Sequence, residues 1–365
     1  MVTNQCNLSC TYCYESVKNR QVILPETAKK VITADIEASR AHTHEYFLIF
    51  HGGEPFLAFD EMKEISEWAW KTFPELQIIC MVTTNGTLIT PEIKAWLTSN
   101  KLRFVPILSI DGSRASHNLN RSNSFDRIDR HFFREMWPFQ PVKMTIAPNV
   151  LDRMFDNYMA LAQEGFIVNP SLAKEVGWNT ESDLPVFARE LKKFADYFVE
   201  NPEIIPCELV NIPMQNFSPQ VSVPHNRACG AGDNIVAYDV KGNRFLCHAF
   251  IGDPNQPYDA DGIGHVFDLL GSNNGLLLSD GCRNCFIFSY CSPCYGLNYA
   301  TRRNMGAFDS VMCKFNKIRV LAAADMFSRM LTAPVKYKVL KDKTSHDQRL
   351  MLSGIQAAFK EISLN

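Results

Sequence analysis

The chain lacks an excess of charge of either sign. Its 365 residues include 37 Lys and Arg against 39 Asp and Glu, which gives a formal net charge of −2. Proteins that bind nucleic acids usually carry a basic excess that neutralises phosphate groups. The charge balance therefore argues against a nucleic-acid partner.

Long hydrophobic runs are also missing. A membrane-spanning helix needs about 20 consecutive apolar residues, and no segment approaches that length. The N-terminus is polar and carries cysteines, which a signal peptide would not. Internal repeats and low-complexity tracts are absent as well. These absences predict a cytoplasmic protein with no membrane partner.

Cysteine, in contrast, is abundant and unevenly distributed. Three of the 12 cysteines fall between Cys6 and Cys13, and seven fall between Cys229 and Cys313. Only Cys80 and Cys207 stand apart. Disulfide-rich scaffolds are usually short and secreted, whereas this chain is long and has no secretion signal. Clusters of cysteine at short spacings therefore predict metal ligation.

The first 200 residues alternate short apolar runs with amphipathic helical patterns. One helix is predicted to begin at Pro25 and another to bury one face between Met62 and Phe73, with further helices near 91, 125, 151 and 183. Such repeated units predict an α/β fold of parallel strands, in an open sheet or a barrel. The predicted strands are 46–50, 77–82, 103–110, 142–147 and 166–168.

The pattern changes after residue 200. Residues 201–228 contain five prolines and are predicted to be a linker. Residues 229–313 are rich in turns and cysteine, with too little apolar periodicity to fold without metal support. After Cys313 the sequence turns helical, so residues 314–365 are predicted to form a helical C-terminal segment. Its apolar stripe consists of Ile318, Leu321, Ala322 and Met326.

The first cysteine group is a CxxxCxxC run formed by Cys6, Cys10 and Cys13. Three thiolates on one loop can converge on one metal centre. A [4Fe–4S] cluster normally takes four ligands, so three cysteines would leave one iron open. On spacing alone, a zinc site completed by a distant fourth ligand is the alternative.

Four segments together resemble the radical SAM superfamily, whose members cleave S-adenosylmethionine (SAM). The loop from Cys6 to Tyr14 resembles its cluster loop. His51-Gly-Gly-Glu-Pro55 resembles the segment that binds the amino group of SAM. Thr83-Thr-Asn-Gly86 and Ser109-Ile-Asp-Gly112 close the next two strands, at the end where barrel enzymes place their sites.

The resemblance implies which residues contact SAM. Backbone at the two glycines would approach the ligand, and Glu54 would pair with its ammonium group. For Arg121 a solvated loop charge is an equal alternative, and Cys80 is expected to be a core residue. The SAM-binding set is Tyr12, Gly52, Gly53, Glu54, Thr84, Asn85, Ser109, Asp111 and Arg121.

The second cysteine group resembles the SPASM extension, which carries auxiliary iron–sulfur clusters in radical SAM enzymes that modify peptides. Only two residues separate Cys291 from Cys294, where such families usually have three, so the ligand partition stays open. A pair of four-cysteine zinc sites is the alternative. By resemblance, the distal auxiliary cluster is held by Cys282, Cys285, Cys291 and Cys313, and the one nearer the active site by Cys229, Cys247 and Cys294. Either Cys207 or a substrate thiolate would be the fourth ligand of the cluster nearer the active site.

The implied architecture is a partial (β/α)6 radical SAM barrel over residues 1–200, followed by a SPASM domain and a C-terminal helix. The implied cofactors are a [4Fe–4S] cluster at the first three cysteines, SAM and two auxiliary iron–sulfur clusters. The reduced cluster would cleave SAM to a 5′-deoxyadenosyl radical, which abstracts hydrogen from a peptide or protein substrate. An electron donor such as flavodoxin or ferredoxin is the expected second partner.

Within this class, the leading hypothesis is a maturase that forms a thioether or carbon–carbon crosslink in a ribosomally made peptide. The nearest rival is an anaerobic sulfatase-maturating enzyme. In such enzymes a catalytic Asp follows the second SPASM cysteine, and His248 takes that place here as a weak catalytic candidate. A non-catalytic zinc-binding interaction protein is the rival of another class. Only a stub of the first strand precedes Cys6, so we expect further residues upstream.

Overall fold

The computed structural model describes residues 1–15, 18–39, 44–212, 229–232, 234–251, 280–283, 285, 287, 290, 291, 293–307 and 309–333. The chain divides into two compact units. The first comprises Met1–Thr145, Ala160–Val168 and Gly230–Phe267, and the second Ile146–Met159, Asn169–Cys229 and Asp268–Asn365. The predicted domain boundaries stay predictions. Residues 213–228 of the predicted linker, together with 252–279 and 334–365, lie outside the described residues.

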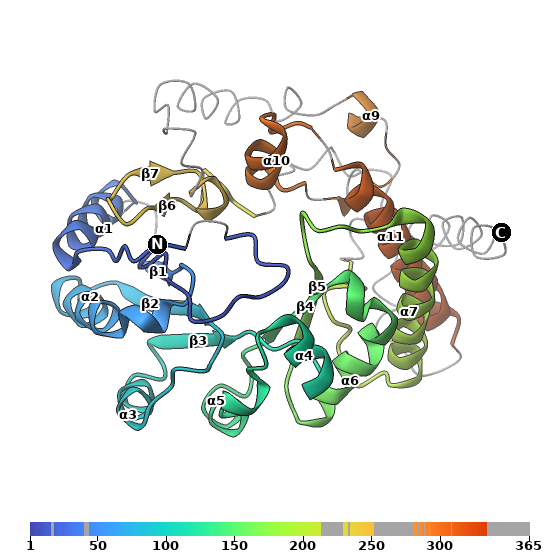
Figure 1. The fold of residues 1–365 in the computed structure, drawn as a ribbon, viewed down its shortest axis with the longest axis horizontal. Coiled ribbons are helices and arrows are strands. Elements are labelled where there is room, and N and C mark those ends of the chain that lie inside the picture. Colours follow the sequence, from blue (N-terminus) through green and yellow to red (C-terminus); the bar gives the residue numbers. More distant parts are fainter. Residues whose placement is uncertain are drawn as a thin grey trace. The chain divides into compact units, whose positions relative to one another are not determined.

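The first unit is built on a parallel sheet (Figure 1). Phe50 pairs with Val82, and Thr84 pairs with Leu108, so the carboxyl ends of the three strands lie level with one another. Parallel bridges extend the series to Thr3 beside Gly52 and to Ser109 beside Lys143. The strands are β1 (Glu45–Phe50), β2 (Gln77–Thr84), β3 (Phe104–Leu108) and β4 (Val142–Ile146).

Helices lie along the outer side of this sheet (Figure 1). Pro25 and Pro91 occupy the first turns of α1 and α3, where a missing N–H costs nothing. Buried and more exposed residues alternate along strand β2. Its buried face includes Cys80 at 0% exposure, which confirms that this cysteine is a core residue. The helices are α1 (Pro25–Ser39), α2 (Phe59–Thr72), α3 (Pro91–Ser99), α4 (Arg114–Asn120) and α5 (Arg130–Met136).

Two sequence predictions were displaced in this region. The helix expected near residue 125 is split into a 3-10 turn, η2 (Phe125–Arg127), and α5, because Asp129 caps α5 by accepting from Phe132 N at 3.1 Å. The strand expected at 166–168 is β5 (Val168–Leu172), which pairs with β4. The Asn-Pro pair at 169–170 is typical of a turn, but it lies within β5 because a strand at the edge of a sheet tolerates proline.

A small antiparallel ribbon also belongs to the first unit. It consists of β6 (Ala237–Tyr238) and β7 (Arg244–Phe245), followed by the 3-10 turn η5 (His248–Phe250). The ribbon packs on α1, since Tyr238 donates its hydroxyl to Asp35 at 3.1 Å. A Cβ at Gly242 would lie 2.8 Å from Thr27. The ribbon of the cysteine-rich segment is therefore anchored on the first helix of the fold.

The second unit centres on two long helices, α7 (Thr180–Glu200) and α11 (Ser310–Thr332), which pack together. Phe315 of α11 contacts Trp178 and Phe187 with ring centroids 4.9 and 5.0 Å away. Helix α11 begins three residues before Cys313, earlier than predicted, because Asp309 caps it by accepting from Val311 N and Met312 N. The remaining elements, some of which cross the boundary between the units, are η1 (Pro55–Ala58), η3 (Pro148–Arg153), α6 (Met154–Gln163), α9 (Asp280–Arg283) and α10 (Tyr295–Arg302).

These elements confirm the predicted α/β class. In the described part of the chain, no helix has both the length and the apolar character that crossing a bilayer requires.

Candidate active site

The first cysteine loop lies at the carboxyl end of the parallel sheet. Residues 3–5, which lead into it, run beside the loop after β1, where Gly53 N donates to Thr3 O at 3.2 Å and Glu54 N to Gln5 O at 2.7 Å. On its other side, Thr11 N donates to Asn120 O at 3.0 Å. The loop is thus held from two directions, by the segment after β1 and by the end of α4.

The three thiols of this loop lie near one another. Burial raises the pKa of Cys10, and the neighbouring Cys13 and Cys6 raise it further, whereas the Arg121 guanidinium lowers it. In the described ranges, no three Cys, His, Asp or Glu side chains are close enough to hold a single metal ion. A [4Fe–4S] cluster binds each thiolate at a separate iron, so it takes sulfurs that are spread more widely. The donor set fits such a cluster.

Gly52 and Gly53 are required by the packing of the chain itself. A Cβ at Gly52 would lie 2.1 Å from Thr3 O, and a Cβ at Gly53 would lie 2.2 Å from Gln5 O. Both distances are shorter than any real contact, so a larger residue would push the cysteine loop away. The structure thus shows a close backbone approach to the N-terminal residues Thr3 and Gln5, while the predicted approach of this backbone to SAM stays a prediction.

Glu54 is the centre of a buried hydrogen-bond network. Its side chain is 1% exposed, and its carboxylate accepts from Thr84 Oγ1 at 2.8 Å, Asn85 N at 2.7 Å and Phe56 N at 3.1 Å. Asn85 in turn donates its side-chain amide to Asn7 Oδ1 at 2.8 Å. Burial raises the pKa of Glu54, while these donors act against that shift. The network joins the ends of β1 and β2 to the cysteine loop.

Asp111 forms the second network. It is buried and accepts from Arg121 Nε at 2.7 Å, from Thr145 N at 2.9 Å and from the Tyr12 hydroxyl. The Arg121 guanidinium also lies 5.4 Å from the Tyr12 ring centroid. Burial lowers the pKa of Arg121, but Asp111, Tyr12 and Cys10 more than offset this and raise it. Arg121 is therefore a buried, charged member of the site and not a solvated loop charge.

Ser109 completes the row of predicted residues. It is 7% exposed, and its backbone N donates to Thr84 O at 2.9 Å across the sheet. The structure therefore gathers all nine predicted SAM-binding residues at one end of the sheet, and six of them form the two networks that each reach the cysteine loop. Their contacts with SAM stay predictions.

The sequence reasoning missed His117 and the neighbours of His248. His117 is fully buried on α4, where its ring accepts from Asp111 N at 3.3 Å and meets Ser124 Oγ at 2.9 Å. Burial lowers its pKa to about 4. Nothing in the sequence marks it, because the residues it contacts are defined only by the fold.

The side chains around the weak catalytic candidate His248 lie beside the cysteine loop. The His248 ring centroid is 4.4 Å from that of His51 and 6.2 Å from that of Tyr14. His51 Nε2 lies 3.1 Å from Glu15 Oε1 and 3.4 Å from the Tyr14 hydroxyl. In the sequence, His51 directly precedes the two glycines and Tyr14 directly follows Cys13. This proximity to the predicted site was the signal that could have identified both residues.

The cysteines of the second group are divided between the two units. Cys247 belongs to the first unit, whereas Cys229 and Cys294 belong to the second. Cys282, Cys285, Cys291 and Cys313 all belong to the second unit. Burial raises the pKa of Cys291 to about 11, with further contributions from the other three, so these four thiols are neighbours.

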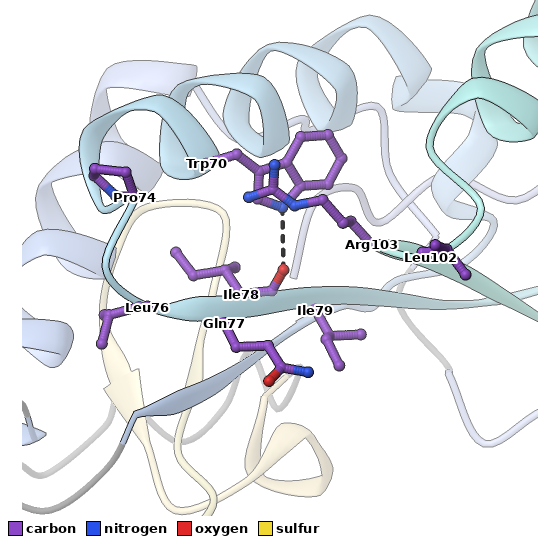
Figure 2. Close-up of a pocket in the computed structure, with 8 residues that line it drawn as sticks. All are labelled: Trp70, Pro74, Leu76, Gln77, Ile78, Ile79, Leu102 and Arg103. Atoms are coloured by element: carbon purple, nitrogen blue, oxygen red, sulfur yellow. Dashed lines mark hydrogen bonds between the residues drawn. The ribbon is translucent and has the colours of Figure 1, made fainter.

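A hollow of about 420 Å³ lies at the opposite end of the sheet (Figure 2). It is lined by residues at the amino ends of β2 and β3, among them Gln77 and Arg103. Trp70 donates its indole N–H to Ile78 O at 3.2 Å, and the Arg103 guanidinium lies 4.5 Å from the Trp70 ring. Sites in such folds form at the carboxyl ends of the strands, so this hollow is separate from the candidate site.

Comparison with known proteins agrees with this geometry. Residues 1–129 match the Radical SAM superfamily. The radical SAM cyclopropyl synthase TigE of Paramaledivibacter caminithermalis is 23% identical over 350 residues, which cover 88% of this chain and 72% of TigE. A cysteine-type anaerobic sulfatase-maturating enzyme of Clostridium perfringens is 30% identical over 141 residues, 34% of this chain and 36% of that enzyme. The solved structure of native anSMEcpe with bound AdoMet and Cp18Cys peptide has a TM-score of 0.68 at 18% identity, covering 93% of this chain and 97% of that one.

The chain carries a radical SAM domain and has the corresponding α/β fold. It is a radical SAM enzyme, as the sequence motifs predicted. A domain of this class implies a [4Fe–4S] cluster and SAM as cofactors.

Proposed function

We propose that this enzyme is a maturase that modifies a peptide, and that Cys6, Cys10 and Cys13 hold the SAM-cleaving cluster. The proposal rests on one observation. The buried networks of Glu54 and of Asp111 both form hydrogen bonds with the loop that carries these three thiols. When bound, the cluster and SAM supply a carbon-centred radical that can abstract hydrogen from an unactivated carbon. The protein orients the substrate and excludes water from that radical.

Glu54 is proposed to accept a hydrogen bond from the ammonium group of SAM. A carboxylate offers about four lone-pair positions, and three are taken by Thr84, Asn85 and Phe56. One position is left for a further donor. The three existing bonds hold the carboxylate in one orientation, which reduces the entropy that binding would cost.

Arg121 is proposed to act on both the cofactor and the loop. Its ion pair with Asp111 is buried, so the guanidinium keeps its charge within the site. It lies near Cys10, whose pKa it lowers, and so favours the thiolate form that binds iron. Tyr12, held by the same Asp111, fixes the loop between the second and third cysteine.

The proposed product is a peptide with a new thioether or carbon–carbon crosslink. The name of TigE supports bond formation between carbon atoms, since a cyclopropyl ring is closed in that way. The peptide bound to anSMEcpe supports a peptide substrate for this fold. A flavodoxin- or ferredoxin-class protein is proposed as the electron donor, and two auxiliary clusters in the SPASM region as further redox sites.

His248 is proposed to accept the proton released when the substrate bond forms. Imidazole titrates near neutral pH, and the neighbouring His51 and Glu15 provide onward acceptors for that proton. His248→Ala should therefore slow product formation while SAM cleavage continues. Equal product formation by His248→Ala and the parent enzyme would refute this role.

Sulfatase maturation is the second candidate, and the relative from Clostridium perfringens favours it. The two functions are separated by one experiment on anaerobically prepared enzyme with reductant and SAM. Mass spectrometry would follow a peptide encoded beside the enzyme gene and, separately, a sulfatase peptide containing the target cysteine. A mass change that maps to a crosslink supports the maturase, whereas formylglycine in the sulfatase peptide supports the rival. Tightly bound zinc and no SAM cleavage would support neither and would favour an interaction protein.

A further inference from the structure

Helix α11 presents polar side chains to the four neighbouring thiols of the second unit. Cys313 is one of the four and lies in the first turns of this helix. Asn316, one turn further, donates its side-chain amide to Cys291 Sγ at 3.7 Å. Lys317, on the same turn, lowers the pKa of Cys313, against the larger raising effect of burial. The helix therefore supplies a ligand together with donors aimed at the ligands.

Arg319 is the feature that no local interaction explains. Its Nε atom is shielded from solvent and has no hydrogen-bond partner among the described residues. Burial lowers the pKa of Arg319, and the two groups that act against this are first Cys291 and then Glu208. Arg319 as a whole is half-buried, but a guanidinium N–H that is shielded from water without a partner is unfavourable, so a negative group beside Nε would balance it.

Besides the Glu208 carboxylate, the thiols are a source of that charge. Cys282, Cys285 and Cys313 each raise the pKa of Cys291, because thiolates brought together repel one another. Arg319 lowers that pKa. Four thiolates around an iron–sulfur cluster carry a net negative charge, which hydrogen bonds and nearby cations stabilise. The orphaned donor of Arg319 and the amide of Asn316 fit the outer side of such a cluster.

We propose that Arg319, assisted by Asn316, is a positioning residue that raises the reduction potential of a cluster held by Cys282, Cys285, Cys291 and Cys313. The proposal rests on the auxiliary clusters of the proposed function. Reduction adds one negative charge to the cluster, and a fixed cation beside Cys291 stabilises the reduced form more than the oxidised form. Arg319 thereby makes this cluster a better electron acceptor.

The test measures the reduction potential of the auxiliary clusters and does not depend on the formation of a modified peptide. A variant with Cys6, Cys10 and Cys13 all replaced by Ala provides the background, since it should lack the SAM-cleaving cluster and its signal. In that background, Arg319→Gln removes the charge and Arg319→Lys keeps it. Arg329→Gln is the matched control, because Arg329 lies on the same helix and pairs with Asp196 at 2.7 Å, away from the cysteines.

Each protein is assayed for iron and sulfide and is then titrated with dithionite while the signal of the reduced clusters is followed by electron paramagnetic resonance. Arg319→Gln should shift the one-electron equilibrium of one cluster about tenfold against reduction, which lowers its midpoint by about 59 mV. Arg319→Lys should recover most of that shift. Arg329→Gln should leave every midpoint unchanged.

The outcomes separate the proposal from the function on which it rests. Unchanged midpoints in Arg319→Gln, with full iron content, would overturn the role of Arg319 and leave the peptide-modifying function intact. Iron lost from Arg319→Gln and kept in Arg319→Lys would support a cation at the cluster, whereas iron lost from both would show a purely structural role. Zinc in place of iron in the background protein would overturn the auxiliary cluster itself.

Discussion

Replacing Glu54 by Gln tests whether the buried carboxylate anchors the site. Gln has the same shape, so its carbonyl oxygen can still accept from Thr84 and Phe56, at 2.8 and 3.1 Å from the present Oε1. Its amide nitrogen would then occupy the place of Oε2, where it faces the N–H of Asn85 at 2.7 Å. Two donors would face each other in a site that water does not reach.

Leaving one buried donor unsatisfied costs about 1–3 kcal/mol. The loss is local, so it should appear as easier opening of the turn after β2. A change of this size corresponds to about 5- to 150-fold faster exchange. Hydrogen–deuterium exchange with mass spectrometry on peptides that contain Asn85 measures it directly. SAM affinity should fall about tenfold as well, because the charge that pairs with the ammonium is lost.

The control is Glu67→Gln, which changes an exposed carboxylate bonded to Trp96 Nε1 at 2.7 Å. It should alter neither exchange at Asn85 nor SAM affinity. Unchanged exchange in Glu54→Gln would refute the anchoring role. Faster exchange with unchanged SAM affinity would keep the anchor and remove the ammonium contact.

Three further outcomes are expected. Replacing Cys6, Cys10 and Cys13 together by Ala should abolish 5′-deoxyadenosine formation from SAM while auxiliary iron remains, and persistent formation would disprove their role. Cys207→Ala should keep its full iron content, because Cys207 is a buried thiol whose pKa burial raises to about 12; loss of one cluster would identify it as a ligand. The folded state keeps His117 neutral down to about pH 4, whereas the unfolded chain binds a proton below about pH 6.5. The free energy of unfolding should thus fall by up to roughly 3 kcal/mol as the pH is lowered from about 6.5 to about 4. In urea titrations, the free energy of unfolding of His117→Asn should depend less on pH.

Local patterns were enough to predict most of the elements. Alternating burial in β2 and the apolar face of α2 follow from periods of two and about 3.6 residues, which the sequence shows directly. Prolines marked the first turns of α1 and α3. Apart from the displaced strand β5, the errors occurred where a cap decided the start of a helix. Asp309 and Asp129 set the starts of α11 and α5, and a capping bond depends on local geometry that hydrophobic periodicity does not describe.

The sequence by itself determined the class of this enzyme, because four segments in order along the chain resemble the radical SAM superfamily, whereas the spacing of the first three cysteines alone left a zinc site open. Only the tertiary structure decided which partner each polar group takes. Glu54 meets Thr84 and Asn85 at the end of the next strand, Arg121 pairs with Asp111, and the charge of Arg319 acts on Cys291. Such pairs join segments that are distant along the chain, and their formation depends on the burial that excludes water from them. No periodicity or spacing in the sequence encodes that exclusion.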